Sequence, residues 1–138
     1  MSRSDKFTPL TKKEYYSDFL MNFDMNPVTG ILARTTNEDA IKQSLKNLIL
    51  TNMTERPYSP LTGSRINSLM FDPIDPFTMD NIKTEIRQTI TNNEPRVNII
   101  DIFVKPSLDQ NTYIVNIIFS VINIPQEIRL EIFLQRVR

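Results

Sequence analysis

The sequence contains no cysteine and no histidine. These two absences exclude Ser-His-Asp and Cys-His catalysis, zinc sites of the usual Cys/His kind, and disulfide bonds. Only two glycines occur among 138 residues, whereas a P-loop or a dinucleotide-binding turn needs several. The chemistry that remains is that of paired carboxylates, a lysine nucleophile or a metal site built from oxygen ligands.

A charge excess is also missing, because sixteen basic residues balance sixteen acidic ones. We therefore expect no general attraction to nucleic acid or to a membrane surface. No apolar run approaches the roughly 20 residues that span a bilayer, and the first sixteen residues lack the apolar core of a signal peptide. With 40% hydrophobic and 23% charged residues, the composition predicts a globular domain. We expect a soluble protein of the cytoplasm, or one that is assembled there.

The first half of the chain predicts an arm followed by two helices. Residues 1–30 are rich in apolar residues without a sustained period, and we expect an irregular arm that packs on its own domain or on a neighbour. Residues 37–53 predict a helix capped by Thr36 or Asn37, and 79–92 predict a second helix capped by Thr78. Prolines predict that 54–66 and 67–77 are irregular. The apolar stripes that indicate the two buried faces are Ile41, Leu45, Leu48, Ile49 and Met53, and Met79, Ile82, Ile86 and Ile90.

The second half predicts three strands at 97–104, 112–122 and 128–137, with a hairpin loop at 105–111. Helices followed by strands favour an α+β fold, in which two helices cover one face of an antiparallel sheet of about three or more strands. We expect a single domain over residues 31–138, preceded by the arm of residues 1–30.

The last predicted strand has the clearest alternation of apolar and polar residues. Its apolar positions predict a half-buried strand at the chain terminus. At a sheet edge, its free backbone groups could pair with another chain, or it could be an ordinary edge strand protected by charge. The apolar positions are Ile128, Leu130, Ile132 and Leu134.

The triplet Glu94-Pro95-Arg96 lies between the second helix and the first predicted strand. Pro95 fixes φ at this junction, and residues two apart in an extended chain point the same way. Glu94 and Arg96 can therefore pair with each other, as an exposed salt bridge in a local turn, or each can bind an opposite charge on a partner.

A catalytic or metal site finds little support. Glu94 and Asp101 lie near strand ends, but no spacing among the sixteen carboxylates identifies a pair of the glycosidase kind. Asp72 and Asp75 are close together, yet each precedes a proline and lacks the calcium-loop pattern, so a turn-forming role is the better account. We expect no catalytic residue, no metal and no cofactor.

Several segments, in order, resemble the baseplate wedge proteins of contractile phage tails, typified by the T-even phage gene 25 product and related to type VI secretion baseplate subunits. The similarity covers residue 31 to the C-terminus, and not the arm. The segments are the loop of Arg56, Pro57, Tyr58, Pro60 and Gly63, the triplet Glu94-Pro95-Arg96, and the hairpin containing Tyr113-Ile114-Val115 and Phe119-Ser120-Val121-Ile122 before Pro125.

The resemblance implies a structural subunit of the virion's tail baseplate. It implies that Glu94, Pro95 and Arg96 contact a helical core bundle of neighbouring wedge proteins, with Arg56, Pro57 and Gly63 in the accompanying loop. It also implies that the segment 128–137 offers strands to the tail sheath protein and so initiates sheath assembly, with tube-end or hub proteins as further partners. Family members have also been called lysozyme-like, so the alternative is a muramidase that acts on peptidoglycan during entry.

Overall fold

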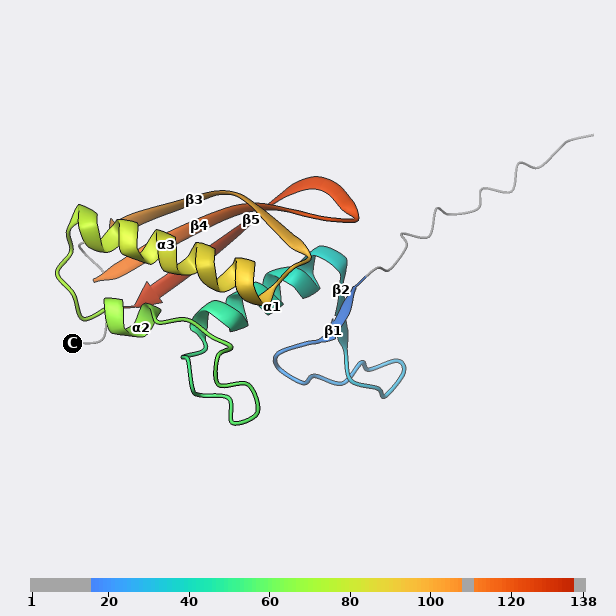
Figure 1. Cartoon of the computed structure of the whole chain (residues 1–138). Helices are drawn as coiled ribbons and strands as arrows, with labels where there is room; N and C mark the ends of the chain where they lie inside the picture. Colours follow the sequence, from blue (N-terminus) through green and yellow to red (C-terminus); the bar gives the residue numbers. More distant parts are fainter. Residues whose placement is uncertain (1–15, 108–110, 136–138) are drawn as a thin grey trace, which may run out of the picture.

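A three-stranded antiparallel sheet and two helices on one of its faces form the body of the molecule (Figure 1). The computed structural model describes residues 16–107 and 111–135. Helix α3 (Pro76–Asn93) packs mainly on strand β3 (Val97–Ser107), while helix α1 (Asn37–Leu50) packs on α3 and reaches strand β5 (Ile124–Gln135). The predicted α+β class, with helices on one face of an antiparallel sheet, is confirmed.

The sheet has the order β3-β4-β5, so β5 lies at an edge. Strand β4 (Thr112–Val121) is central and pairs with both neighbours, Ile117 lying opposite Ile102 on β3 and Leu130 on β5. Apolar side chains at every second position of β4 and β5 are buried against the helices, as the alternation predicts. The β4 members are Tyr113, Val115, Ile117, Phe119 and Val121.

Both helices place their predicted apolar stripes in the core. A helical spacing of three and four residues keeps these side chains on one face, and that face meets the buried side of the sheet. The core side chains from the helices include Ile41, Leu45 and Ile49 of α1 and Ile82, Ile86 and Ile90 of α3, all at most 1% exposed.

The helix boundaries differ from those predicted. Helix α1 ends at Leu50, because Thr51 is extended and both its N–H and its hydroxyl bond to the Asn47 carbonyl, at 3.0 and 2.6 Å. Met53 therefore lies outside the helix. Helix α3 begins at Pro76, three residues early, since proline needs no N–H donor in the first turn.

Asp75, and not Thr78, is the N-cap of α3. Its carboxylate accepts a hydrogen bond from the Thr78 N–H at 2.6 Å, which lowers the pKa of Asp75. The prediction that Asp75 and Pro76 only break regular structure was wrong, because an acid followed by proline is also a favourable helix start.

Regular structure extends further than predicted at three other places. A short helix, α2 (Ile66–Leu69), lies in a region predicted to be irregular. Strand β3 continues through Pro106 to Ser107, which an edge strand tolerates. Strand β5 begins at Ile124 rather than 128. The last residues of the predicted strand, 136 and 137, and part of the predicted hairpin loop, 108–110, lie outside the described residues.

Residues 16–36 form a hairpin that projects from the body, and we call this segment the flap (Figure 1). Strands β1 (Ser17–Phe19) and β2 (Arg34–Thr36) pair at its base. The predicted boundary between arm and domain at residues 30 and 31 falls inside the flap, and residues 1–15 of the predicted arm lie outside the described part of the chain. None of the described helices combines the length and apolar character that a membrane span requires.

Candidate partner-binding site

The α3–β3 junction brings Glu94 and Arg96 together. Helix α3 ends where the Glu94 backbone leaves the helical region, with φ −129° and ψ 79°, since a following proline disfavours the helical conformation. The Glu94 N–H still donates to the Ile90 carbonyl at 2.8 Å, and Val97 begins strand β3. This leaves Pro95 exposed at the corner between two flanking side chains.

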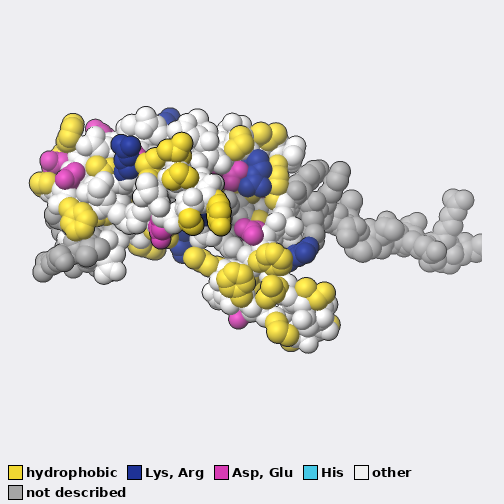
Figure 2. Space-filling model, turned by 60° about the horizontal axis from the view of Figure 1, so that its bottom comes forward, with side chains coloured by type: hydrophobic (Ala, Val, Ile, Leu, Met, Phe, Trp, Pro, Cys, Tyr) yellow, Lys and Arg dark blue, Asp and Glu magenta, His cyan; other side chains and the backbone are white. Residues whose placement is uncertain are grey.

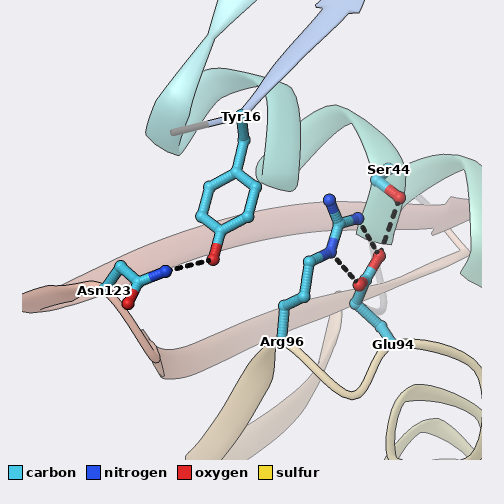
Figure 3. Close-up of polar contacts among 5 residues, drawn as sticks. All are labelled: Tyr16, Ser44, Glu94, Arg96 and Asn123. Carbon is cyan, nitrogen blue, oxygen red and sulfur yellow. Dashed lines mark hydrogen bonds and ion pairs between the residues drawn. The ribbon is translucent and has the colours of Figure 1, made fainter. Parts of the chain in front are cut away.

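Glu94 and Arg96 form a bidentate ion pair (Figure 3). Arg96 Nε donates to Glu94 Oε1 at 2.5 Å, and Arg96 Nη2 donates to Oε2 at 2.7 Å. Ser44 of α1 donates its hydroxyl to Oε2 at 3.1 Å. The Glu94 side chain is only 7% exposed, whereas that of Arg96 is 42% exposed. The two residues therefore pair with each other, but the carboxylate is buried and the pair is not an exposed salt bridge.

The hydrogen bonds from Arg96 lower the pKa of Glu94, although burial alone would raise it. Glu94 is consequently an ionised acceptor that fixes the guanidinium in position. The same bonds raise the pKa of Arg96. The arrangement presents a permanent positive charge at the surface, held in one orientation by a buried negative charge.

Tyr16, at the base of the flap, covers the guanidinium of Arg96 (Figure 3). The guanidinium carbon lies 5.1 Å from the Tyr16 ring centroid, within the range of a cation–π contact. The Tyr16 hydroxyl accepts a hydrogen bond from Asn123 Nδ2 at 3.1 Å, and the Asn37 N–H donates to the Tyr16 carbonyl at 2.7 Å. The flap is thus joined to α1, to the α3–β3 junction and to the β4–β5 turn.

Sequence reasoning missed Tyr16, Ser44 and Asn123 as members of this cluster. They lie 80, 52 and 27 positions from Arg96 in the chain, and none stands in a motif of its own. No local signal in the sequence identifies them, because their proximity to Glu94 and Arg96 depends on tertiary packing.

The three predicted loop residues differ in their surroundings. Arg56 and Pro57 are exposed. Gly63 is buried at the root of the loop with φ +139°, and a Cβ there would lie 2.7 Å from the Thr51 carbonyl oxygen. Gly63 lines one groove of about 490 Å³ with Asn93, so the loop root and the α3–β3 junction share a surface. Arg56 and Pro57 are not among the residues that line this groove.

The four predicted positions of the last strand point inward. The side chains of Ile128, Leu130, Ile132 and Leu134 are buried in the core, so they cannot themselves contact a partner while the domain stays folded. Strand β5 can offer only its backbone edge and its outward side chains, such as Phe133, to another chain.

The two carboxylates considered for catalysis are both engaged. Asp101 lies 3.7 Å from Lys83 Nζ and accepts a hydrogen bond from the Ile102 N–H, while Glu94 is held by Arg96. Among the described residues, no group of three or more acidic side chains is placed to hold a metal ion. A glycosidase needs a carboxyl group with a raised pKa as its acid, which is the opposite of what Arg96 does to Glu94.

Comparisons with known proteins show the family to which this chain is similar. A family model described as baseplate wedge protein gp25 matches residues 35–126. The baseplate wedge protein gp25 of Enterobacteria phage T4 is 34% identical over 97 residues, which is 70% of this chain and 74% of the phage T4 protein. Both the α3–β3 junction and the loop of residues 51–65 lie inside the matched range.

Two solved structures share the fold. A Geobacter sulfurreducens protein provisionally called a tail lysozyme superposes with a TM-score of 0.71 at 19% identity, covering 78% of this chain and 97% of that one. A chain of the anti-feeding prophage baseplate superposes with a TM-score of 0.62 at 20% identity, covering 89% of this chain and 87% of that one. At these identities the likeness shows the fold alone.

Proposed function

This chain belongs to the family of baseplate wedge proteins of the gp25 kind, and from that membership we propose that it is a structural, non-enzymatic subunit that clamps neighbouring wedge proteins around the tail tube. The observation that carries the proposal is the Arg96 guanidinium, which is fixed by a buried carboxylate and remains 42% exposed. A charge that is held rigidly at the surface is suited to docking a partner.

The chemistry of docking follows from the donors that Arg96 keeps. Two of its five N–H groups bond to Glu94. The others can reach a carbonyl or carboxylate oxygen of a helix bundle, where arginine recognises such groups with a planar fork. In this proposal Arg96 makes the polar contact, Glu94 orients it and Pro95 fixes the backbone. Gly63 shapes the adjoining groove, while Arg56 and Pro57 extend the contact.

The test is co-expression with the neighbouring wedge proteins of the same virus, read by size-exclusion chromatography. Substituting Arg96→Ala alone would leave a buried carboxylate without its main partner, so the informative variant is Glu94→Gln with Arg96→Gln, which removes both charges together. The matched control is Arg87→Gln, because Arg87 is exposed on α3 away from the ion pair. We expect the control to co-elute with the wedge proteins and the double variant to elute separately.

Co-elution of a folded double variant at the wild-type level would remove Glu94 and Arg96 from the interface. A folded state is established beforehand by circular dichroism and a cooperative urea transition. The loop is tested in the same assay with Arg56→Gln, which should weaken but not abolish co-elution because Arg56 is exposed and outside the ion pair.

We also propose that the β5 edge pairs with a strand of the sheath protein and so initiates sheath assembly. The support is that β5 is an edge strand of twelve residues, which leaves backbone donors and acceptors for a further strand. Because the chain has no cysteine, a single Glu131→Cys on β5 can be cross-linked specifically. A cross-link to the sheath protein is expected, and its absence in assembled tails would exclude the pairing.

A muramidase is the second candidate, because the Geobacter sulfurreducens neighbour has been called a tail lysozyme. That likeness concerns the fold alone, and the ionised, arginine-bound Glu94 does not suit a general acid. We expect no release of peptidoglycan fragments by the purified chain between acidic and neutral pH. Cleavage that one carboxylate substitution abolishes, with folding retained, would instead establish the enzyme.

The remaining expectations are proposals of the same kind. The baseplate of the virion is the place of action, assembly occurs in the host cytoplasm, and tube-end or hub proteins are further neighbours. The division into an arm of residues 1–30 and a wedge-like domain of residues 31–138 is tested by limited proteolysis, which should remove residues of the arm before it cuts the domain.

A further inference from the structure

The flap exposes a concentration of apolar side chains. Five of them are each more than half exposed, and all five lie between strands β1 and β2. Figure 2 shows hydrophobic side chains gathered on this projecting part of the molecule. The five are Met21, Phe23, Met25, Val28 and Ile31.

The flap has an ordered backbone, with hydrogen bonds between its two halves along its length. Beyond β1 and β2, the Ala33 N–H donates to the Asp24 carbonyl and the Asn26 N–H to the Ile31 carbonyl, both at 2.8 Å. The Asn26 side chain closes the distal loop by accepting from the Val28 N–H at 2.9 Å. Its exposed apolar side chains are therefore displayed on a defined backbone.

Contacts of Tyr16 and Phe19 fix the base of the flap to the body. Gln43 of α1 donates to the Phe19 carbonyl at 2.7 Å, and Tyr16 covers Arg96. The flap thus begins at the α3–β3 junction proposed to dock a wedge protein. A partner seated on Arg96 would lie beside the flap.

The exposed apolar area matches one side of a specific protein interface. If a fully exposed aromatic side chain presents about 200 Å² and the smaller methionine, valine and isoleucine side chains somewhat less, the five together expose on the order of 600 Å². A standard interface buries roughly 800 Å² on each partner. An exposed apolar surface of this size is comparable to the largest apolar patch of a typical monomer, and such patches often have a function.

From these observations we propose that the flap inserts into an apolar groove of a neighbouring baseplate protein, a contact additional to that of Arg96. The inference rests on the proposed baseplate function. The family model begins at residue 35, so nearly all of the flap precedes the matched region.

A protein groove suits the flap better than a second copy or a membrane. Two grooves of this chain are lined by charged side chains, Arg65 and Glu85 in one and Lys105 and Arg129 in the other, so neither gives the flap of a second copy a matching apolar surface. The flap has two acids and one base among residues 16–36, which disfavours an anionic membrane surface.

Methionine oxidation tests the proposal on the full chain. Met21 and Met25 are exposed and Met70 is buried, so dilute hydrogen peroxide should oxidise the first two rapidly and Met70 slowly. The probe is the set of wedge proteins of the same virus, co-expressed and purified with the chain. In that complex we expect oxidation of Met21 and Met25 to slow by about fivefold or more.

A pair of variants provides the second measurement. Phe23→Ser with Val28→Ser removes apolar surface from the flap, and Phe71→Ser with Phe77→Ser removes a comparable amount elsewhere, since all four side chains are exposed. The flap variant should bind the wedge proteins about tenfold more weakly or worse, and the control should bind like the wild type.

Each outcome has a defined meaning. Co-elution of the wild type with unprotected Met21 and Met25 overturns the flap contact and leaves the proposed function standing. Protection of the same residues in the chain alone at high concentration, or by vesicles containing anionic lipid, overturns it in favour of a second copy or a membrane. No co-elution of the wild type removes the proposed function, and the flap contact with it.

Discussion

Replacing Arg96 with alanine should destabilise the folded domain through the carboxylate that it leaves behind. Glu94 is 7% exposed and accepts two hydrogen bonds from Arg96 and one from Ser44. After Arg96→Ala, the Ser44 hydroxyl and the backbone N–H of residue 96 remain as donors, but no positive charge faces a carboxylate that is almost fully withdrawn from water. The cost therefore arises from an uncompensated buried charge and not only from a lost contact.

The magnitude follows from the burial of the two partners. Removing one partner of a fully buried ion pair costs roughly 3–5 kcal/mol. Because Arg96 is 42% exposed, its removal admits water to one side of the carboxylate, and we expect about 2–3 kcal/mol. Glu94→Gln combined with Arg96→Ala removes the charge as well, so that double variant should lose only about 1 kcal/mol. The Tyr16 contact is lost in both variants and cancels in their comparison.

Urea unfolding at pH 7 and at acidic pH measures these differences. In the wild type the pKa of Glu94 is lowered by folding. Its contribution is therefore present above the pKa of the unfolded chain, about 4.3, and is lost as the pH falls through the lower folded value. In Arg96→Ala burial raises the pKa of Glu94, so the buried carboxyl takes up a proton more readily. The gap in stability between wild type and variant should consequently narrow as the pH is lowered.

Equal unfolding free energies for Arg96→Ala and the double variant at pH 7 would refute this reasoning, because Glu94 would then be indifferent to its partner. A difference in unfolding free energy between wild type and Arg96→Ala that stays constant with pH would refute it too. The corresponding single variant Glu94→Gln, in which Arg96 stays partly solvated, completes the thermodynamic cycle.

Three further predictions concern the scaffold, and urea unfolding measures each. Gly63→Ala should lose about 2 kcal/mol or more, because its backbone has positive φ and a Cβ would meet a carbonyl oxygen at 2.7 Å, whereas Gly30→Ala, with φ +66° and no atom within 4 Å, should lose about 1 kcal/mol; equal losses would contradict the steric argument. Ile132→Ala should cost about 2–4 kcal/mol as a core truncation, and the exposed neighbour Phe133→Ala about 0.5 kcal/mol or less; reversed costs would mean that β5 has the opposite register. Asp75→Ala should lower stability less at acidic pH than at pH 7, since its lowered pKa makes the cap a benefit of the ionised form; a cost independent of pH would remove the carboxylate from the cap.

The sequence could predict those features that repeat at short range. The period of two in β4 and β5 and the stripes of α1 and α3 predicted most of the core side chains that these elements contribute, because spacing determines which side chains share a face. Element ends were less predictable. The end of α1 depends on Thr51, whose hydroxyl competes for a helix carbonyl, and the start of α3 depends on proline in a role opposite to that of a breaker.

The sequence by itself determined the fold class and the absence of Cys/His chemistry, and it indicated Glu94 and Arg96 as a candidate site. Only the tertiary structure decided that Glu94 is buried, because its burial depends on α1 bringing Ser44 to the end of α3. The flap likewise became visible only in three dimensions, since apolar residues without a period give no signal of whether they are covered. Local spacing fixes which face of a helix or strand is apolar, but exposure depends on which distant segments pack against it.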